Sequence, residues 1–314
     1  MASRKLDERL EQLRRLRSAV PDGEVVGVLR KSLRDKSNLV VAEAAKTIAS
    51  VRMPSLIPDL VESMNRLFDD PIKSDPKCWG KTAIAKALTD LDYDQSLAFL
   101  RGARHVQMEP VWGGHEDAAP QFRGTCLLAL VQCSDLLRVE VFRHLVDALT
   151  DPADPVRLEA VRALSQLGGD EANLLLRLKA RSGDKRSAVT GQVFDALLAL
   201  DPRNGVPFVA EFMNSSELEV RDEGALALGS SRLPEAVDLL IKQWNETKDR
   251  EFGAVLLRAM SSSRQQVALD FLLNLVRTGS TRDMTMALDA LKLHADSTEI
   301  QAKLDQARKE RPEN

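Results

Sequence analysis

The chain has 314 residues, of which 44% are hydrophobic, 29% charged and only 4% aromatic. This profile is typical of Leu, Ala and Val packed between helices, and it argues against a β-protein with an aromatic core. The formal net charge is −3, from 44 basic and 47 acidic residues, so the chain as a whole has no positive field to attract nucleic acid or anionic lipid. We therefore expect neither nucleic acid nor a membrane as a partner.

The cysteines and the N-terminus indicate the compartment. Cys78, Cys126 and Cys133 form no CxxC pair and no Cys/His spacing of a zinc site, which favours reduced, buried thiols. The first residues alternate charge with Leu and contain no apolar leader, and no later stretch is long enough to span a bilayer. The expected location is cytoplasmic.

In chain order, the sequence predicts a capping helix in residues 1–21, a repeat array in residues 22–295, and a second capping helix with a tail in residues 296–314. The clearest repeat, Asp151 to Gly168, places Val156, Ala160 and Val161, with three further apolar residues, on one helical face. The same pattern recurs, and its first face positions are Val40, Gly80, Phe122, Val156, Val189, Val220, Phe252 and Asp283. The intervals are 40, 42, 34, 33, 31, 32 and 31 residues.

Most intervals also contain an earlier apolar segment, so each repeat is predicted to be a pair of helices. These first segments are Val141 to Thr150, Ala172 to Ala180, Val206 to Met213, Ala236 to Trp244, and Val267 to Val276. One helix pair cannot bury its own apolar stripe, which is why such units stack. The predicted fold is an all-α solenoid of about eight helix pairs.

Polar residues predict where helices begin. Asp75 and Asp154 each precede a proline and are expected to be N-caps. Ser216 with Glu219, and Ser280 with Asp283, have the spacing of a capping box. No alternating segment is bounded by Asn-Gly or Asp-Gly, so no β-hairpin is predicted.

The motif D-x-x-x-V-R-x-x-A-x-x-A-L, which runs from Asp151 or Asp154 through Leu164 and recurs from Val220 to Leu228, resembles the short HEAT or HEAT-like repeat, also found in phycobilin lyase subunits. The resemblance covers nearly the entire chain. It implies a solenoid strongly and a function weakly, because the family includes scaffolds, adaptors and a few enzymes.

The two longest intervals contain insertions, at residues 67–80 and about 101–121. Insertions in solenoids form loops, and loops concentrate binding residues. Trp112 lies between Val111 and a Gly-Gly pair, where it either anchors a partner or folds back into the groove. Trp79 begins a helix and is expected in the core or at a helix end.

The remaining candidates are charged or polar. The cluster of His105, His115, Glu116 and Asp117 lacks the spacing of a metal site or an acid–base pair and is interpreted as a polar loop. Four repeats carry a basic residue at the second position of the second helix, which either pairs with a neighbouring acid or forms a ladder for an acidic peptide. The candidate partner-binding residues are Trp79, Lys81, His105, Trp112, His115, Asp117, Arg123, Arg157 and Arg221.

No nucleotide-binding or hydrolase motif occurs, so no catalytic residue, metal or cofactor is expected. The favoured hypothesis is a non-catalytic scaffold that binds a protein or peptide through its concave groove and the 101–121 loop. Two alternatives stay open. One is a DNA-binding enzyme resembling alkylpurine DNA glycosylases, for which Trp79, Trp112 and Asp117 would be the relevant residues, and the other is a phycobilin lyase-like chromophore handler.

Overall fold

The computed structural model describes residues 2–18 and 22–312. The predicted capping helix therefore includes residues outside the described range (1 and 19–21), as does the C-terminal tail (313–314). Contacts divide the chain into two compact units, Met1–Leu167 (unit 1) and Gly168–Asn314 (unit 2). Within the described ranges, no helix is both long enough and apolar enough to cross a membrane.

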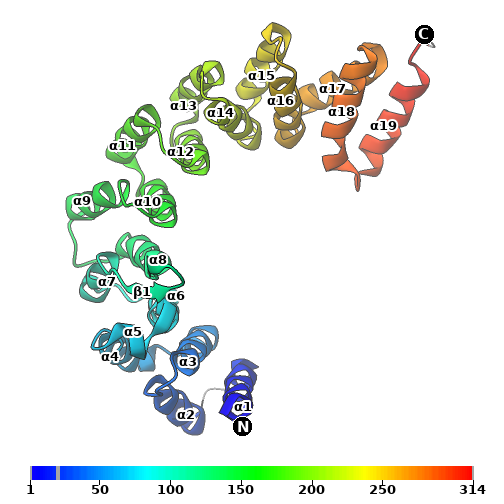
Figure 1. The fold of residues 1–314 in the computed structure, drawn as a ribbon. Helices are drawn as coiled ribbons and strands as arrows, with labels where there is room; N and C mark the ends of the chain where they lie inside the picture. The colour runs from blue at the N-terminus through cyan, green and yellow to red at the C-terminus, as the bar shows by residue number, and fades with distance from the viewer. Residues whose placement is uncertain (1, 19–21, 313–314) are drawn as a thin grey trace. The chain divides into compact units, whose positions relative to one another are not determined.

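Both units are built from helix pairs joined by short turns (Figure 1). Unit 1 contains α1 (Ala2–Arg15), α2 (Gly23–Leu33), α3 (Asn38–Ser50), α4 (Ile57–Arg66), α5 (Pro71–Ser74), α6 (Trp79–Asp90), α7 (Ser96–Ala103), β1 (Met108–Val111), β2 (Gly114–Asp117), α8 (Pro120–Leu130), α9 (Arg138–Ala148) and α10 (Asp154–Leu167). Unit 2 contains α11 (Gly169–Ser182), α12 (Ser187–Leu200), α13 (Pro202–Glu211), α14 (Leu218–Ser230), α15 (Pro234–Glu246), α16 (Arg250–Ser263), α17 (Gln266–Thr278), α18 (Thr281–Leu291) and α19 (Thr298–Lys309). Short 3₁₀ turns are Leu16–Ser18, Pro54–Leu56, Pro76–Cys78, Phe212–Asn214 and Lys292–His294.

The prediction of an all-α solenoid of about eight helix pairs is confirmed for the described residues, which form eight such pairs. In unit 1 the second helices α3, α6, α8 and α10 pack on one another in order, and in unit 2 α12, α14, α16 and α18 do the same. We call each of these stacks a second-helix layer. The first helix of each pair packs against its own second helix, while α1 packs on α3 and α19 on α17.

The apolar stripes predicted from the repeats form the core. Val156, Ala160 and Val161 on α10 are at most 1% exposed, and Val40, Phe122 and Phe252, at the first face positions of their helices, are equally buried. Each such large apolar side chain contributes about 1.5–3 kcal/mol when fully buried. Burial between neighbouring repeats, rather than intrinsic helix propensity, therefore stabilises these short helices.

The predicted caps had mixed outcomes. The Ser280 side chain accepts a hydrogen bond from Asp283 N (3.1 Å) and caps α18, as predicted. The capping box at Ser216 is wrong, because Glu217 is the N-cap residue of α14 and its N–H donates to Ser215. Asp75 is the N-cap residue of the 3₁₀ turn Pro76–Cys78, as predicted, but its side chain makes no cap bond to that turn. Its carboxylate instead accepts from Gly80 N (2.7 Å) and Lys81 N (2.9 Å) in the first turn of α6.

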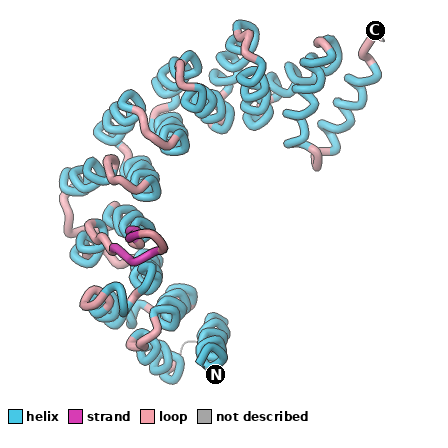
Figure 2. Tube along the Cα trace, viewed as in Figure 1, coloured by secondary structure: helices cyan, strands magenta, loops and turns pink. Residues whose placement is uncertain are grey.

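The prediction that no β-hairpin occurs is wrong. Strands β1 and β2 pair antiparallel, with Met108 opposite Asp117 and Val111 opposite Gly114 (Figure 2). The two-residue turn is Trp112-Gly113, in which Gly113 has φ +91°. That left-handed conformation favours glycine, so the Gly at this place was the available signal, although the turn lacks the Asn-Gly or Asp-Gly pair that the sequence search required.

Candidate functional site

The hairpin carries the most exposed large apolar side chain among the described residues. Trp112 at its tip is fully exposed, and Met108 and Val111 on β1 are 46% and 45% exposed. An indole in water at the end of a two-stranded ribbon contributes nothing to the core of its own chain. Of the two possibilities left open by the sequence, Trp112 therefore points to solvent and does not plug the groove.

Gln107 fixes the base of the hairpin to the rest of unit 1. It is 2% exposed, and its side-chain N–H groups donate to the carbonyls of Asp75 (2.9 Å) and Pro71 (3.2 Å) and to Glu109 Oε1 (2.6 Å). Its Oε1 accepts from Lys81 Nζ (3.0 Å) and faces His105 Nε2 and Cys78 Sγ. Sequence reasoning missed Gln107 because a lone glutamine belongs to no motif.

The backbone closes the same base. Ala118 N donates to Gln107 O (2.9 Å), and Gln107 N donates to the Asp117 carboxylate (3.1 Å). From the opposite side, Lys77 N donates to Glu109 Oε1 (2.6 Å). The two strands thus emerge from a clamped root, which restricts the directions available to the hairpin tip.

Lys81 lies beneath this root and is completely buried. Its ammonium donates hydrogen bonds to Gln107 Oε1 (3.0 Å) and Leu67 O (3.3 Å), and it forms an ion pair with Asp75 Oδ2 (3.3 Å). A buried cation with these internal partners is stabilised by the fold and is not displayed to a partner. Burial also raises the pKa of neighbouring Cys78 to about 12, more than Lys81 lowers it, so that thiol stays protonated.

Asp117 and Arg123 join the hairpin to α8. Arg123 is 3% exposed and binds Asp151 through two hydrogen bonds of 3.0 and 3.1 Å, while its other terminal nitrogen contacts Asp117. Burial works to raise the pKa of Asp117, but hydrogen bonds from Arg123, Ala119 N and Gln107 N outweigh it and lower that pKa below its usual value. The carboxylate is therefore ionised and engaged, which leaves no free base at the position that the glycosylase-like hypothesis needs.

The other two basic candidates are also engaged internally. Arg157 is 7% exposed and donates to the carbonyls of Asp151 (2.8 Å) and Pro152 (3.1 Å). In unit 2, Arg221 pairs with Asp249 at 2.8 Å and stacks on Phe252, with its guanidinium carbon 4.1 Å from the ring centroid. Arg123 and Arg221 therefore each contact an acid of the next repeat, as one of the two alternatives for this position held, whereas Arg157 donates to backbone carbonyls.

The two histidines differ in environment. His105 is half-buried, its ring lies edge-on to Phe68 at 5.0 Å, and burial lowers its pKa, which favours the neutral imidazole. His115 lies on β2 and is exposed. No group of three or more His, Cys, Asp or Glu side chains that could hold a metal ion occurs in residues 2–18 and 22–312.

Trp79 is the second exposed indole of unit 1. It is 48% exposed at the first position of α6, so it is not a core residue as one expectation held, and Lys77 Nζ lies 5.4 Å from its ring centroid. The backbone N–H of Lys77 donates a hydrogen bond to Glu109 on β1, so Lys77 is attached to the hairpin root. Both exposed tryptophans of unit 1 are therefore tied to the hairpin or its root.

The second-helix layer of unit 1 also contains a hollow. A cavity of about 530 Å³ lies between α3 and α6 and is lined by the cations Lys46, Arg52 and Lys86, the anion Asp90, and small or polar residues. Three of the four charged side chains are positive, and one of them, Arg52, is paired with Asp92 at 3.3 Å.

Comparison with known proteins returns structural likeness alone. No family model matches the chain, and no curated protein matches it significantly. Among solved structures, human deoxyhypusine hydroxylase in complex with glycerol is 21% identical with a TM-score of 0.30, over 84% of this chain and 90% of that one. Two engineered proteins are 16% and 18% identical with TM-scores of 0.36 and 0.22, over 96% and 92% of this chain and 94% and 96% of theirs. Similarity at this level assigns no function, and the HEAT-like character of the repeats stays a resemblance in sequence.

Proposed function

We propose that this protein is a non-catalytic scaffold that binds a protein partner, with the hairpin Met108–Asp117 as its main contact. The observation that carries the proposal is the fully exposed Trp112 at the tip of a hairpin whose root is clamped by buried polar groups. A tryptophan ordered in this way buries roughly 200 Å² on binding and loses little side-chain entropy.

The root explains why the tip would bind well. Gln107, Asp117 and Glu109 hold the strands through hydrogen bonds of 2.6–3.1 Å, so the hairpin needs little further ordering when a partner arrives. Preorganisation of this kind increases affinity without any added contact. A partner that covers Trp112 would also contact Val111, which directly precedes it on the hairpin.

The acid, cation and thiol at the hairpin root are engaged or buried, which favours binding over chemistry there. Asp117 is engaged with Arg123, Lys81 is buried, and the Cys78 thiol is buried and protonated. The three free cysteines are all buried thiols, which agrees with the expected cytoplasmic compartment. The second-helix layer of unit 1, with its hollow between α3 and α6, would provide the secondary contacts.

The test uses a photo-crosslinking amino acid at position 112 and, as a matched control, at position 97. Leu97 is 80% exposed on α7 of the same unit, away from the hairpin strands in sequence. We expect a defined protein to crosslink from position 112 and not from position 97. With that protein purified, Trp112→Ala should weaken binding by about 30-fold or more, and Leu97→Ala by less than about threefold.

Circular dichroism of both variants keeps the result interpretable, because neither exposed side chain supports the core. Equal affinity of wild type and Trp112→Ala for the crosslinked protein would contradict the proposal. Chemical alteration of the crosslinked protein by this chain in a turnover assay would also contradict the proposal, because the proposed scaffold is non-catalytic.

A further inference from the structure

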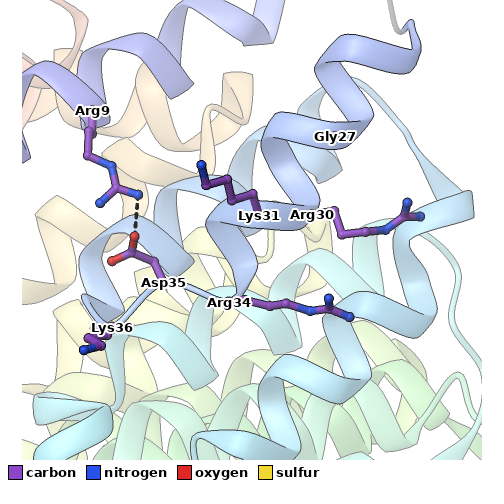
Figure 3. Close-up of a pocket in the computed structure, with 7 residues that line it drawn as sticks. All are labelled: Arg9, Gly27, Arg30, Lys31, Arg34, Asp35 and Lys36. Atoms are coloured by element: carbon purple, nitrogen blue, oxygen red, sulfur yellow. Dashed lines mark hydrogen bonds and ion pairs between the residues drawn. The ribbon is translucent and has the colours of Figure 1, made fainter.

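A second hollow, of about 710 Å³, opens beside α2 at the beginning of unit 1. It is lined by Arg9 of α1, by residues of α2 and by the turn that follows α2. The full lining is Arg9, Gly27, Arg30, Lys31, Arg34, Asp35 and Lys36 (Figure 3). Five of these seven side chains are cations and one is an anion.

The charges divide into satisfied and unsatisfied groups. Arg30 pairs with Asp59 (2.9 Å), Arg34 pairs with Glu62 (3.1 Å), and Arg9 pairs with Asp35. Figure 3 shows Arg30 and Arg34 extending to one side of α2, while Lys31 lies on the side of Arg9. Lys31 and Lys36 are exposed and form no ion pair with any described residue, so the hollow keeps an excess of two positive charges.

Gly27 lines the hollow on α2. It lies in the interior of α2, where glycine costs about 1 kcal/mol relative to alanine. A Cβ at this position would meet nothing within 4 Å, so no packing constraint requires the glycine. The missing side chain leaves an open floor one helical turn before Lys31.

The local charge contrasts with the rest of the unit. Residues 1–52 contain twelve Lys and Arg against seven Asp and Glu, whereas residues 53–167 contain twelve against seventeen. An extended polyanion that left the basic end would meet repulsion along the remainder of unit 1. A short anionic segment that ends within the hollow would not.

We infer that this hollow binds a short acidic peptide segment, through the ammonium groups of Lys31 and Lys36 with the Arg9 guanidinium beside them. Carboxylates of clustered Asp or Glu would replace the missing counter-charges, and the open floor at Gly27 would admit the peptide backbone. The site is separate from the hairpin and does not depend on the function proposed for it.

The direct test measures binding of a fluorescent hexaglutamate peptide to the full chain by anisotropy at low salt. We expect saturable binding that weakens as salt screens the charges, and no binding of a hexaglutamine peptide. The variant Lys31→Glu/Lys36→Glu should weaken binding about tenfold or more. The matched control Lys185→Glu/Lys309→Glu makes the same change in net charge at two exposed lysines of unit 2, and it should change affinity less than about threefold.

Gly27 provides a second, independent variant. Gly27→Glu fills the floor and adds a negative charge, and it should abolish binding, whereas Gly27→Ala should leave binding nearly intact. Both substitutions favour the helix, so loss of fold does not explain a loss of binding.

Several outcomes would overturn the inference. They are no saturable binding of hexaglutamate, binding that survives Lys31→Glu/Lys36→Glu, and tighter binding of a ten-residue oligothymidylate at the same lysines, which would assign the surface to nucleic acid. Trp112→Ala should leave hexaglutamate binding unchanged, so failure at the hairpin and failure at the hollow are distinguishable.

Discussion

The helix pairs around the hairpin and the helix pairs of unit 2 differ in how they accommodate a basic side chain between neighbouring second helices. In each region one basic residue directly follows the first face position of a second helix and contacts an acid. In unit 2, Arg221 reaches Asp249 at the start of the next second helix and its side chain stays 14% exposed. At the hairpin root, Lys81 is 0% exposed, its acid Asp75 is 0% exposed, and Gln107 completes the set.

The difference shows what an insertion does to a repeat. In unit 2 the neighbouring repeat supplies the counter-charge of Arg221, and the exposed part of the side chain is solvated by water. At the insertion the added segments close over the pair, exclude water, and convert a surface ion pair into a buried network that supports the hairpin. The same sequence position therefore has different energetic weight in the two regions.

The largest expected effect comes from breaking the buried network. Asp75→Ala leaves the Lys81 ammonium without its carboxylate and removes the acceptor of Gly80 N and Lys81 N. The loss of a buried partner costs about 3–5 kcal/mol in the free energy of unfolding. Urea titration followed by far-UV circular dichroism measures it. Asp249→Asn is the counterpart in unit 2, and we expect a much smaller loss there because its carboxylate is exposed; equal losses would remove the distinction between the regions.

Close packing offers a second comparison, through the same substitution at two glycines. A Cβ on Gly229 of α14 would lie 2.2 Å from the carbonyl oxygen of Ala259, which is backbone of α16 and has little room to move. A Cβ on Gly102 of α7 would meet the Cys126 sulfur at 2.3 Å and the Phe122 ring at 2.8 Å, which are side chains. We expect Gly229→Ala to cost about 3 kcal/mol and Gly102→Ala about 1–2 kcal/mol in thermal or urea unfolding. The reverse order would show that the α7–α8 contact is the more rigid of the two.

The sequence predicted the regular region far better than the insertion. In unit 2, periodicity located all four second helices, because alternation of buried and exposed positions is a local property of the chain. At the insertion, the decisive contacts join residues such as Gln107 and Asp75, 32 positions apart, and no periodic pattern encodes such a pairing. Composition identified Trp112 as a candidate, but its exposure depends on the hairpin, which the search for Asn-Gly and Asp-Gly turns did not find.

The two regions also differ in how left-handed residues are arranged, because those of unit 2, Arg232 and Arg264, occur singly. Lys77 and Cys78 are consecutive non-glycine residues with φ of +60° and +53°, just where the hairpin root meets α6. Lys77→Gly should relieve the left-handed strain and raise the free energy of unfolding by up to about 1 kcal/mol. The matched change Lys242→Gly in α15 of unit 2 introduces glycine into a regular, exposed helix and should cost about 1 kcal/mol. If Lys77→Gly also destabilises, the Lys77 side chain contributes more than its conformation costs.

The smallest expected effect is on the free energy of unfolding when a single carboxylate is neutralised. Its sign is opposite at the hairpin and in unit 2. Asp117 at the hairpin has a lowered pKa, whereas burial, with repulsion from Asp195, Asp222 and Glu219, raises the pKa of Glu223 in unit 2. A raised carboxyl pKa means that the folded state binds the proton more tightly, so the unfavourable contribution of Glu223 appears as pH rises through that pKa and is complete at neutral pH. Glu223→Gln should therefore stabilise the protein at pH 7 by roughly 0.5 kcal/mol or less, because partial exposure screens the charge, and the gain should vanish in acid.

The lowered pKa of Asp117 has the opposite consequence. The stabilisation from this carboxylate is present at neutral pH and is lost as the pH falls through the pKa that Asp117 has in the folded state. Asp117→Asn should therefore destabilise the protein at pH 7 and have no effect in acid. Paired urea titrations at both pH values measure the two trends, and a gain from Glu223→Gln that persisted in acid would point to packing against Gly191 rather than charge as the cause.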